Sequence, residues 1–409
     1  MKRLLNLALG VMTAIGGFVD IGNLVTSGVT GARFGLSLVW ALAFGTFAMT
    51  LYGEMAGRVT AVARRPVFHL VRERLGVRMA MVNLTASLLL NLLTVAAELG
   101  GVGLALYLAS SISYILWVPI IGFLVWFFIW RVPFKVIDNV FGLLGLTLVV
   151  FVVALIKLHP NWHVLGSQIV HPAVPSGESH ATWWFYAITL IGACVVPYQA
   201  FFFSSGAIEE GWSEKNLLDM RMNALIGFPL GGALSLAIMA VAVPVLEPRG
   251  IQVNHLGQVA LPVVTALGKV GLILALVGFF AATFAAAVEA ALSSGYIVAQ
   301  YLGWTWGKFR TPAQAHRFHA VCLVTLILAT GLVLTTIDPV KITVISVALG
   351  AAAIPLTFFP VLVVANDREY MGKHVNKAWT NVLAVLVFCA LVAVSVATLP
   401  LLFWTKAGQ

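Results

Sequence analysis

Charged side chains are scarce in this chain: only 10% of its 409 residues are Asp, Glu, Lys or Arg, whereas 61% are hydrophobic. A water-soluble domain cannot cover its surface with so few charges, so that class of protein is excluded. Apolar stretches continue along the whole sequence and no small-residue cleavage site follows the first, which argues against a cleaved signal peptide. The composition predicts an all-α polytopic membrane protein.

Cysteines and catalytic motifs are also sparse. The three cysteines, Cys194, Cys322 and Cys389, lie in apolar segments, which indicates neither a disulfide framework nor a thiolate metal cluster. The sequence contains no His-Glu-x-x-His zinc motif and no Gly-x-Ser-x-Gly nucleophile turn. We therefore expect no catalytic residues, no cofactor and a protein that is not an enzyme.

Eleven apolar stretches are long enough to span a bilayer as helices of about 20 residues. With the N-terminus cytoplasmic and the C-terminus outside, eighteen of the 24 basic residues fall on inner segments and six on outer ones. This bias obeys the positive-inside rule and explains the net charge of +9 without a nucleic-acid partner. We expect an integral protein of the plasma (inner) membrane, in contact with lipid. The predicted spans begin near Leu4, Leu36, Met79, Tyr114, Phe134, Thr182, Met222, Val270, Ala320, Ile342 and Trp379.

The spans fall into two repeats within a single transmembrane domain, 1–409. Repeat one covers about 4–157, repeat two about 182–365, and the extra helix about 379–403. In an alternating topology, two five-span units have opposite orientations. The intervening stretch 158–181 is predicted to be a polar outer loop, whose four histidines we interpret as solvated because their spacing fits no compact ligand set.

Two stretches, 176 positions apart, interrupt the apolar runs in a similar way. The first, 15–23, is rich in glycine, which permits a helix to unwind. The second, 191–199, contains Pro197, which lacks a backbone N–H and leaves a carbonyl near Ala193 without its helical partner. Paired interruptions in two halves of a membrane chain indicate a transporter's substrate site. The alternative for Pro197 is a simple helix kink.

Three acidic residues, Asp20, Glu98 and Glu289, lie well inside predicted spans. An ionised carboxylate near the bilayer centre costs at least about 2.5 kcal/mol, so such a residue normally faces a partner or water. Asp20 is either part of an oxygen-rich cation site or a hydrogen-bond partner of a neighbouring helix. Glu98 and Glu289 either relay protons or form static hydrogen bonds. Glu54 and Asp138 lie nearer the inner span ends, and we expect them to be structural.

The sequence resembles the Nramp family of proton-coupled divalent-metal transporters. The segment Asp20-Ile21-Gly22-Asn23 resembles the family's Asp-Pro-Gly-Asn motif in span one. The segment 192–199, Gly-Ala-Cys-Val-Val-Pro-Tyr-Gln, resembles its Gly-Ala-Thr-Val-Met-Pro-His-Asn motif in span six. Further similarity lies in Ala97-Glu98 with Gly101, and in Pro355, Pro360 and Met371-Gly372.

The resemblance implies a LeuT-like fold with two inverted five-helix repeats, an eleventh helix, and substrate held between broken helices one and six. By residue matching, it implies that Asp20 and Asn23 are metal-ligating side chains and that Ala193 contributes a backbone carbonyl. Glu98 matches an acid of the family's proton route, for which Glu289 is a second candidate. The substrate-site neighbours are expected to be Gly22, Val196, Pro197, Tyr198 and Gln199.

Several positions depart from the family pattern. Val196 stands at the family's methionine, so the soft sulfur that favours transition metals is missing. Tyr198 replaces a histidine, and Val95 stands where an aspartate would precede Glu98. These differences leave transition-metal selectivity and proton coupling open, and they suggest a divergent member close to the Nramp-related magnesium transporters.

We expect a secondary transporter that moves a divalent metal cation by alternating access and tolerates hard ions such as magnesium or manganese. Proton coupling is left open, with protons as the candidate coupling ion. The sequence leaves three alternatives open: a manganese or iron transporter without a sulfur ligand, a LeuT-like carrier of a non-metal substrate, and a transport-inactive sensor. The single carboxylate of Asp20 balances only half the charge of a divalent ion, which favours keeping the non-metal alternative.

Overall fold

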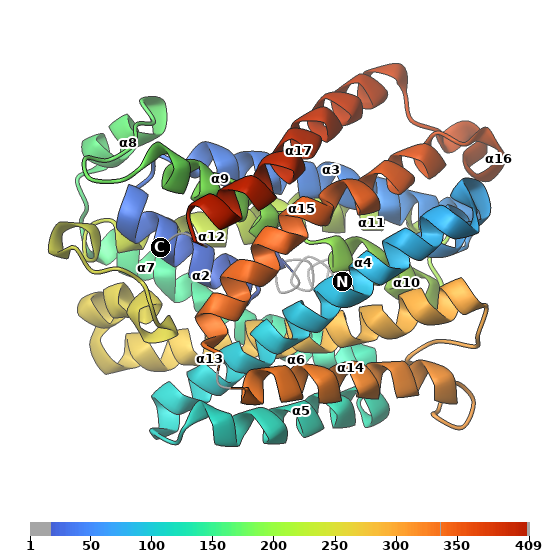
Figure 1. The fold of residues 1–409 in the computed structure, drawn as a ribbon, viewed down its shortest axis with the longest axis horizontal. Helices are drawn as coiled ribbons and strands as arrows, with labels where there is room; N and C mark the ends of the chain where they lie inside the picture. Colours follow the sequence, from blue (N-terminus) through green and yellow to red (C-terminus); the bar gives the residue numbers. More distant parts are fainter. Residues whose placement is uncertain (1–17, 336, 407–409) are drawn as a thin grey trace.

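The computed structural model describes residues 18–335 and 337–406, apart from the side chains of 134, 135 and 138. The secondary structure of this part is entirely helical. The long helices lie alongside one another, and most connections gather at two opposite ends of the molecule (Figure 1). The helices are α2 (Ile21–Phe34), α3 (Val39–Ala63), α4 (Val67–Ser110), α5 (Tyr114–Arg131), α6 (Phe134–Gly145), η1 (Leu146–Val149), α7 (Val150–Lys157), α8 (Trp162–Val170), α9 (His180–Cys194), α10 (Pro197–Glu209), η2 (Glu214–Asn216), α11 (Leu217–Met222), η3 (Asn223–Gly227), α12 (Phe228–Ala242), η4 (Glu247–Arg249), α13 (Leu256–Leu302), α14 (His316–Leu334), α15 (Pro339–Ala365), α16 (Arg368–Met371), η5 (Gly372–His374) and α17 (Ala378–Trp404).

Nine helical segments of the described residues are long and apolar enough to cross a membrane. They correspond to predicted spans three to eleven. The second predicted span is α3, which has 25 residues but is less apolar because it carries Glu54 and Arg58. The first predicted span, from Leu4, lies outside the described residues except for its end.

The helices pack in two groups. In one group, α2, α3, α9, α10 and α12 contact one another. In the other, α4, α5, α13 and α14 do so. These groups lie mainly in the upper and lower halves of Figure 1, respectively. The helix α15 contacts both groups, through α3 and α9 on one side and α4 on the other.

The two longest helices, α4 and α13, each bend at a glycine. Gly76 in α4 has φ 83° and Gly268 in α13 has φ 63°, backbone conformations that suit glycine. The predicted spans beginning near Met79 and Val270 start just after these bends. Hydropathy therefore marks the apolar part of each helix, while its first turns precede the bend.

The stretch 158–181 contains a helix, so the prediction of a simple loop there was wrong. The helix α8 occupies Trp162–Val170 and is capped by Asn161, whose side-chain oxygen accepts hydrogen bonds from the backbone N–H of His163 and Val164. A capped helix of nine residues is too short to give a spanning signal in the sequence.

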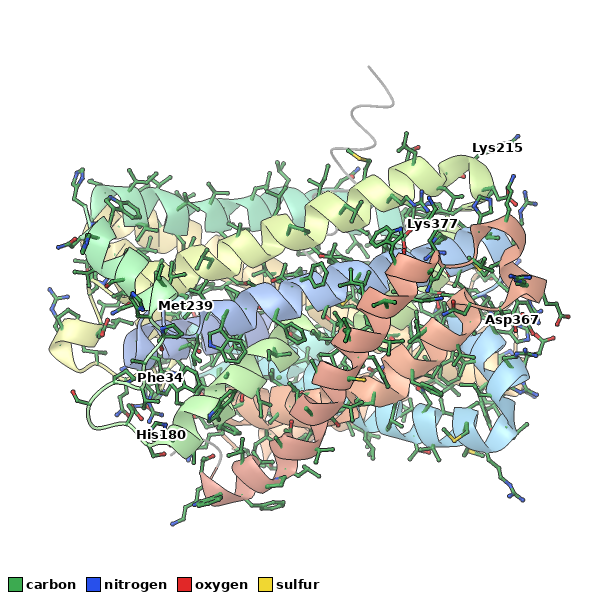
Figure 2. The ribbon with its side chains drawn as sticks, turned by 90° about the horizontal axis from the view of Figure 1, so that it is seen from above. Phe34, His180, Lys215, Met239, Asp367 and Lys377 are labelled. Carbon is green, nitrogen blue, oxygen red and sulfur yellow. The ribbon has the colours of Figure 1, made fainter. Side chains whose placement is uncertain are left out.

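Connections that the sequence assigns to the inner side and to the outer side lie at opposite ends of the molecule. Lys215 and Lys377, both on predicted inner segments, lie at one end, and His180, on the predicted outer connection, lies toward the other (Figure 2). The exposed helix sides between these ends are apolar, with Leu116 and Val382 among the well-exposed side chains. This distribution is that of a protein whose sides face lipid.

Candidate functional site

The predicted break in span six is present, between α9 and α10. The helix α9 ends at Cys194 and α10 begins at Pro197. Between them, Val195 has φ −109° and ψ 71°, and Val196 has φ −87° and ψ 119°, neither of which is helical. Pro197 occupies the first turn of α10, where its missing N–H costs no helical hydrogen bond.

The described part of the first break lies at the start of α2. Phe18 is helical, Val19 and Asp20 are not, and α2 begins at Ile21. Asp20 has an extended backbone and caps α2, because its Oδ1 accepts a hydrogen bond of 2.8 Å from the backbone N–H of Asn23. The glycines at 16 and 17 lie outside the described residues.

The buried side chain of Asn23 joins the two breaks. Its Nδ2 donates to the carbonyl of Phe18 at 2.7 Å and to the carbonyl of Ala193 at 2.8 Å. The same nitrogen lies 3.4 Å from Asp20 Oδ1. On its other side, Asn23 Oδ1 accepts a hydrogen bond of 3.3 Å from Ser235 Oγ. Three oxygen atoms from the two broken helices therefore converge on one point, which the Asn23 amide nitrogen occupies.

Glu98 reaches the same place from α4. Its side chain is fully buried, and both carboxylate oxygens lie 3.3 Å from the backbone nitrogen of Ile21, next to Asp20. Gly101 permits this approach, since a Cβ there would lie 2.9 Å from Ile21 Cδ1. A small residue next to Glu98 on α4 thus lets α2 approach closely.

Glu289, on α13, is the second buried acid in this region. It is almost fully buried and close enough to interact electrostatically with Glu98. One turn further along α13, Ser293 Oγ donates to the carbonyl of Tyr198 at 3.4 Å. The helices α4 and α13 therefore each contribute a buried carboxyl group, and α13 also contacts the start of α10 through Ser293.

A cavity lies between the broken helices, α4 and α15. Of the predicted site residues, Asp20, Gly22, Glu98, Val196, Pro197 and Tyr198 line it. Asn23, Ala193, Gln199 and Glu289 are buried but do not line it. The cavity lining contains no cysteine or methionine. The Tyr198 hydroxyl is buried and forms no hydrogen bond with the described residues.

Several polar residues of the cavity were missed by the sequence-based predictions. Asn91 and Thr94 stand on the same face of α4 as Glu98, and Thr343 and Ser346 face them from α15. Thr94 Oγ1 and Ser346 Oγ lie 3.4 Å apart. Polar residues spaced three, four and seven positions apart in an apolar helix share one face, a signal that was available in the sequence.

The described residues contain no group of three or more His, Cys, Asp or Glu side chains placed to hold a metal ion together. Any cation held at the breaks would therefore depend on backbone carbonyls and the Asn23 amide as well as on Asp20. Such a donor set consists of oxygen atoms, which suit hard cations.

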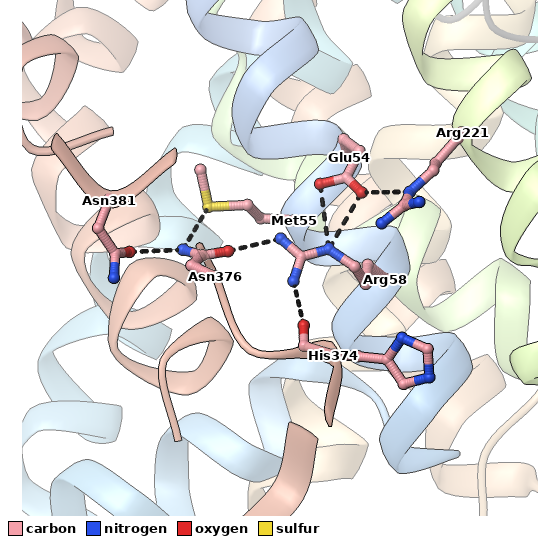
Figure 3. Close-up of polar contacts among 7 residues, drawn as sticks. All are labelled: Glu54, Met55, Arg58, Arg221, His374, Asn376 and Asn381. Atoms are coloured by element: carbon pink, nitrogen blue, oxygen red, sulfur yellow. Dashed lines mark hydrogen bonds and ion pairs between the residues drawn. The ribbon is translucent and has the colours of Figure 1, made fainter. Parts of the chain in front are cut away.

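Glu54, which we expected to be structural, belongs to a separate polar cluster at the end of the molecule that carries Lys215. Its carboxylate binds Arg58 at 3.0 Å and Arg221 at 2.9 Å (Figure 3). Arg58 also donates to the carbonyl of His374 at 2.5 Å and to Asn376 Oδ1 at 2.6 Å. This cluster joins α3 and α11 to the connection between α15 and α17. The side chain of Asp138 is not described.

The fold, the two helix breaks and the buried acid between them are typical of membrane transporters built on broken helices. Residues 10–400 match the family model described as "Natural resistance-associated macrophage protein-like", or Nramp. The chain belongs to this family, as the sequence motifs predicted.

Curated relatives match over most of their length. A divalent metal cation transporter MntH of Klebsiella pneumoniae (strain 342) is 24% identical over 372 residues, covering 90% of this chain and 87% of that protein. A protein of the same name from Pectobacterium carotovorum is 21% identical over 385 residues, covering 93% and 90%.

Solved structures share the fold. A manganese transporter of Eremococcus coleocola superposes with a TM-score of 0.74 at 18% identity, covering all of this chain and 95% of that one. The protein MhsT, in complex with L-phenylalanine, gives a TM-score of 0.65 at 14% identity, covering 97% of this chain and 98% of that one. The expected all-α, LeuT-like fold is confirmed.

Proposed function

We propose that this chain is a secondary transporter that moves a hard or borderline divalent cation, magnesium or manganese, across the membrane by alternating access. The curated relatives named above are divalent metal cation transporters, and one similar structure is a manganese transporter. Asp20, Asn23 and the Ala193 carbonyl are the proposed ligands. The observation that carries this proposal is the convergence of oxygen atoms from both helix breaks.

The Asn23 amide occupies the place proposed for the cation's contacts. Its Nδ2, a group with partial positive charge, is surrounded by the Phe18 carbonyl, the Ala193 carbonyl and Asp20 Oδ1. Rotation of the amide by half a turn would present Oδ1 to the same oxygens and Nδ2 to Ser235. Four oxygen atoms facing one another are stable only around a cation, so the rotated amide completes an oxygen site. Phe18 thereby joins the ligands expected from the sequence.

The absence of sulfur from the described cavity lining supports the hard-ion assignment. Val196 faces the cavity where a soft ligand would stand. Cys194 Sγ points instead toward the Leu42 carbonyl and Asn23 Oδ1, at 3.9 Å from each. Oxygen ligands favour magnesium and manganese over softer metals. Gly22, Pro197, Tyr198 and Gln199 complete the substrate surroundings, and the Tyr198 hydroxyl is available to a water molecule of a partly hydrated ion.

Glu98 and Glu289 form the proposed proton route. Glu98 touches the backbone next to Asp20, and Glu289 lies within electrostatic range of Glu98. A proton that enters this pair would lower the negative charge beside a bound cation, and its departure would restore it. Such an exchange couples cation movement to proton movement.

The proposed topology places the N-terminus in the cytoplasm and the C-terminus outside, in a plasma (inner) membrane. It rests on the basic residues and on the gathering of Lys215 and Lys377 at one end (Figure 2). Repeat one at 4–157 and repeat two at 182–365 are part of the same proposal.

The test is uptake of magnesium, manganese, calcium and cadmium into proteoliposomes by wild type and Asp20→Asn, with an internal pH dye. We expect Asp20→Asn to lower uptake about tenfold or more, because a charged ligand contact is worth roughly 1.5–3 kcal/mol. The matched control is Asp338→Asn. Asp338 caps α15 as Asp20 caps α2, accepting a 2.9 Å hydrogen bond from Val340, but it does not line the cavity.

Both variants should keep the wild-type melting temperature in detergent to within a few degrees, so that lost uptake is not lost folding. Full uptake by Asp20→Asn would contradict the proposed site. Folded wild type that carries none of the four ions would point to a non-metal substrate.

Glu98→Gln should abolish internal acidification while cation binding persists, and unchanged proton flux would remove Glu98 from the route.

A further inference from the structure

A groove on the lipid-facing side of the molecule lies between α4, α13 and α14. Its volume is about 480 Å³, within the range of roughly 300–1,000 Å³ typical of small-molecule sites. Leu88 and Leu92 of α4, Val298 of α13 and Val324 and Leu328 of α14 form most of its wall. Such a wall, within the membrane, selects a hydrocarbon occupant.

One end of the groove carries a guanidinium group. Arg317, in the first turn of α14, lines the groove together with Trp304. The Arg317 guanidinium lies 5.2 Å from the centre of the Trp304 ring. Within the described residues it forms no hydrogen bond or ion pair, so its five N–H groups are available to a ligand.

The position of Arg317 on α14 is unfavourable for a cation unless an anion is present. The N-terminus of a helix carries partial positive charge, which repels arginine and attracts phosphate. A phosphate at this end would satisfy both the guanidinium and the helix terminus. Arginine binds phosphate oxygens in pairs, and its apolar stem lies easily along a hydrocarbon surface.

The Arg317 end of the groove also lies at the level where headgroups are expected. The connection from α13 to α14 lies at the same end of the molecule as α16, in the part of Figure 1 where the predicted inner segments gather. Leu328 lies eleven positions after Arg317 on α14, a rise along the helix of about 16 Å. The charged end therefore meets the interface and the apolar end extends into the hydrocarbon layer.

We propose that this groove binds an anionic phospholipid, with its phosphate on Arg317 and an acyl chain along α14. A second groove, between α3 and α12, provides an internal comparison. It has a similar volume, about 390 Å³, and an apolar wall with Thr46 and Thr50, but no charged residue lines it. The proposal applies to the first of these two grooves because, among the residues the structure describes, it combines the hydrocarbon wall with an unpaired cation, whereas the second does not.

The bound lipid would support the helices that carry the proposed proton route. Behind the groove, toward the protein interior, α4 and α13 are joined through Asn91. Its amide oxygen accepts a hydrogen bond of 3.2 Å from Ser294 Oγ. Leu92 and Val298 stand beside this contact and line the groove. The inference itself does not depend on which substrate is carried.

The test is native mass spectrometry of the purified full chain, titrated with dioleoyl-phosphatidylglycerol or dioleoyl-phosphatidylcholine. We expect the first phosphatidylglycerol to bind about tenfold more tightly than phosphatidylcholine, equivalent to about 1.4 kcal/mol. Arg317→Gln should remove that preference. The matched control is Arg131→Gln: Arg131 stacks on Trp130 at 4.2 Å but does not line the groove, so the preference should remain.

A second variant keeps the charge and fills the groove. Ala320 lines it and is exposed, and Ala320→Trp should weaken the binding of both lipids. Equal affinity of wild type for both lipids would overturn the proposal, as would equal effects of Arg317→Gln and Arg131→Gln. Competition by soluble glycerol phosphate at similar concentrations would show an anion site without an acyl-chain groove, and unchanged binding by Ala320→Trp would place the lipid elsewhere.

Discussion

Asn23 couples the two helix breaks through one amide group. Its nitrogen contacts carbonyls of both broken helices, and its oxygen contacts Ser235 of α12. An apolar residue at this position would leave the Phe18 and Ala193 carbonyls buried without a partner. The residue is thus required for the structure of the site as well as proposed for ligand binding, so its own replacement would not separate the two roles.

Introducing a sulfur at position 196, in the break between α9 and α10, should change ion selectivity. We expect Val196→Met to strengthen cadmium inhibition of manganese uptake about tenfold, an effect of about 1.4 kcal/mol, because a thioether prefers soft cations. The measurement is the cadmium concentration that halves uptake. Leu90→Met, which adds a sulfur to the cavity from α4, is the control and should change it little. Identical behaviour of the two variants would mean that Val196 does not contact the ion.

Gly22 is packed too closely for a side chain. A Cβ there would lie 2.8 Å from Val347 Cγ2 and 3.0 Å from Asp20 Oδ1. We expect Gly22→Ala to cost about 1–3 kcal/mol of stability and to reduce uptake, with partial recovery in combination with Val347→Ala. Gly350→Ala is the control, since Gly350 lines the same cavity and a Cβ there meets nothing within 4 Å. Thermal melting in detergent and uptake would both be measured, and equal effects at the two glycines would refute the packing argument.

The residues of the site were predictable where the sequence itself breaks a helix. Asp20, Asn23 and Pro197 stand at such breaks, and the carbonyl of Ala193, near which the sequence predicted a freed carbonyl, accepts a hydrogen bond from Asn23. The Phe18 carbonyl was not predictable, because a backbone oxygen has no residue-type signature. Ser235 was missed because its contact with Asn23 joins positions 212 apart, and only the folded chain brings them together.

At the scale of the element, apolar runs predicted the helices better than their bounds. The helices α4 and α13 begin before their predicted spans because their first turns precede glycine bends. The short helix α8 has a clear cap but no apolar run of spanning length. Hydropathy detects the contact with lipid, whereas caps and bends are set by single residues.

The cluster around Arg58 holds several elements together at one end. Arg58 is nearly buried and binds Glu54, the His374 carbonyl and Asn376 (Figure 3). We expect Arg58→Gln to lower the stability by about 2 kcal/mol, because it removes charged hydrogen bonds to Glu54, the His374 carbonyl and Asn376, while Arg221 still pairs with Glu54. Thermal melting in detergent would report this loss.

Arg368 supplies the matched control for Arg58. Arg368 lies on α16, in the connection between α15 and α17 that Arg58 contacts, but it is exposed. Arg368→Gln should change the melting temperature little. If both variants melted alike, the buried contacts of Arg58 would not contribute as the structure indicates.

At the scale of the whole molecule, alternating access requires the two groups of helices to move against each other. The helix α10 of one group contacts α13 of the other through Ser205 and Gln300, whose side chains form a 2.8 Å hydrogen bond. Within one group, α10 contacts α3 through Ser204 and Thr60, at 2.7 Å. These pairs provide crosslinking sites between groups and within one group.

A crosslink between the groups should stop uptake while leaving ion binding intact. The cysteine pair Ser205→Cys with Gln300→Cys tests this, in a Cys389→Ser background because Cys389 is the exposed one of the three cysteines. The pair Thr60→Cys with Ser204→Cys, crosslinked within one group, should retain most uptake. Full uptake by the first crosslinked pair would exclude relative motion of α10 and α13 from the cycle.

The Asn23 amide has one further consequence, for the return half of the transport cycle. A carrier that has released its cargo must bring the same oxygen atoms back across without mutual repulsion. The N–H groups of Asn23 satisfy the Phe18 and Ala193 carbonyls in place of a cation. We expect a protein with such an internal substitute to reset while unloaded, and so to perform net movement as well as exchange of one ion for another.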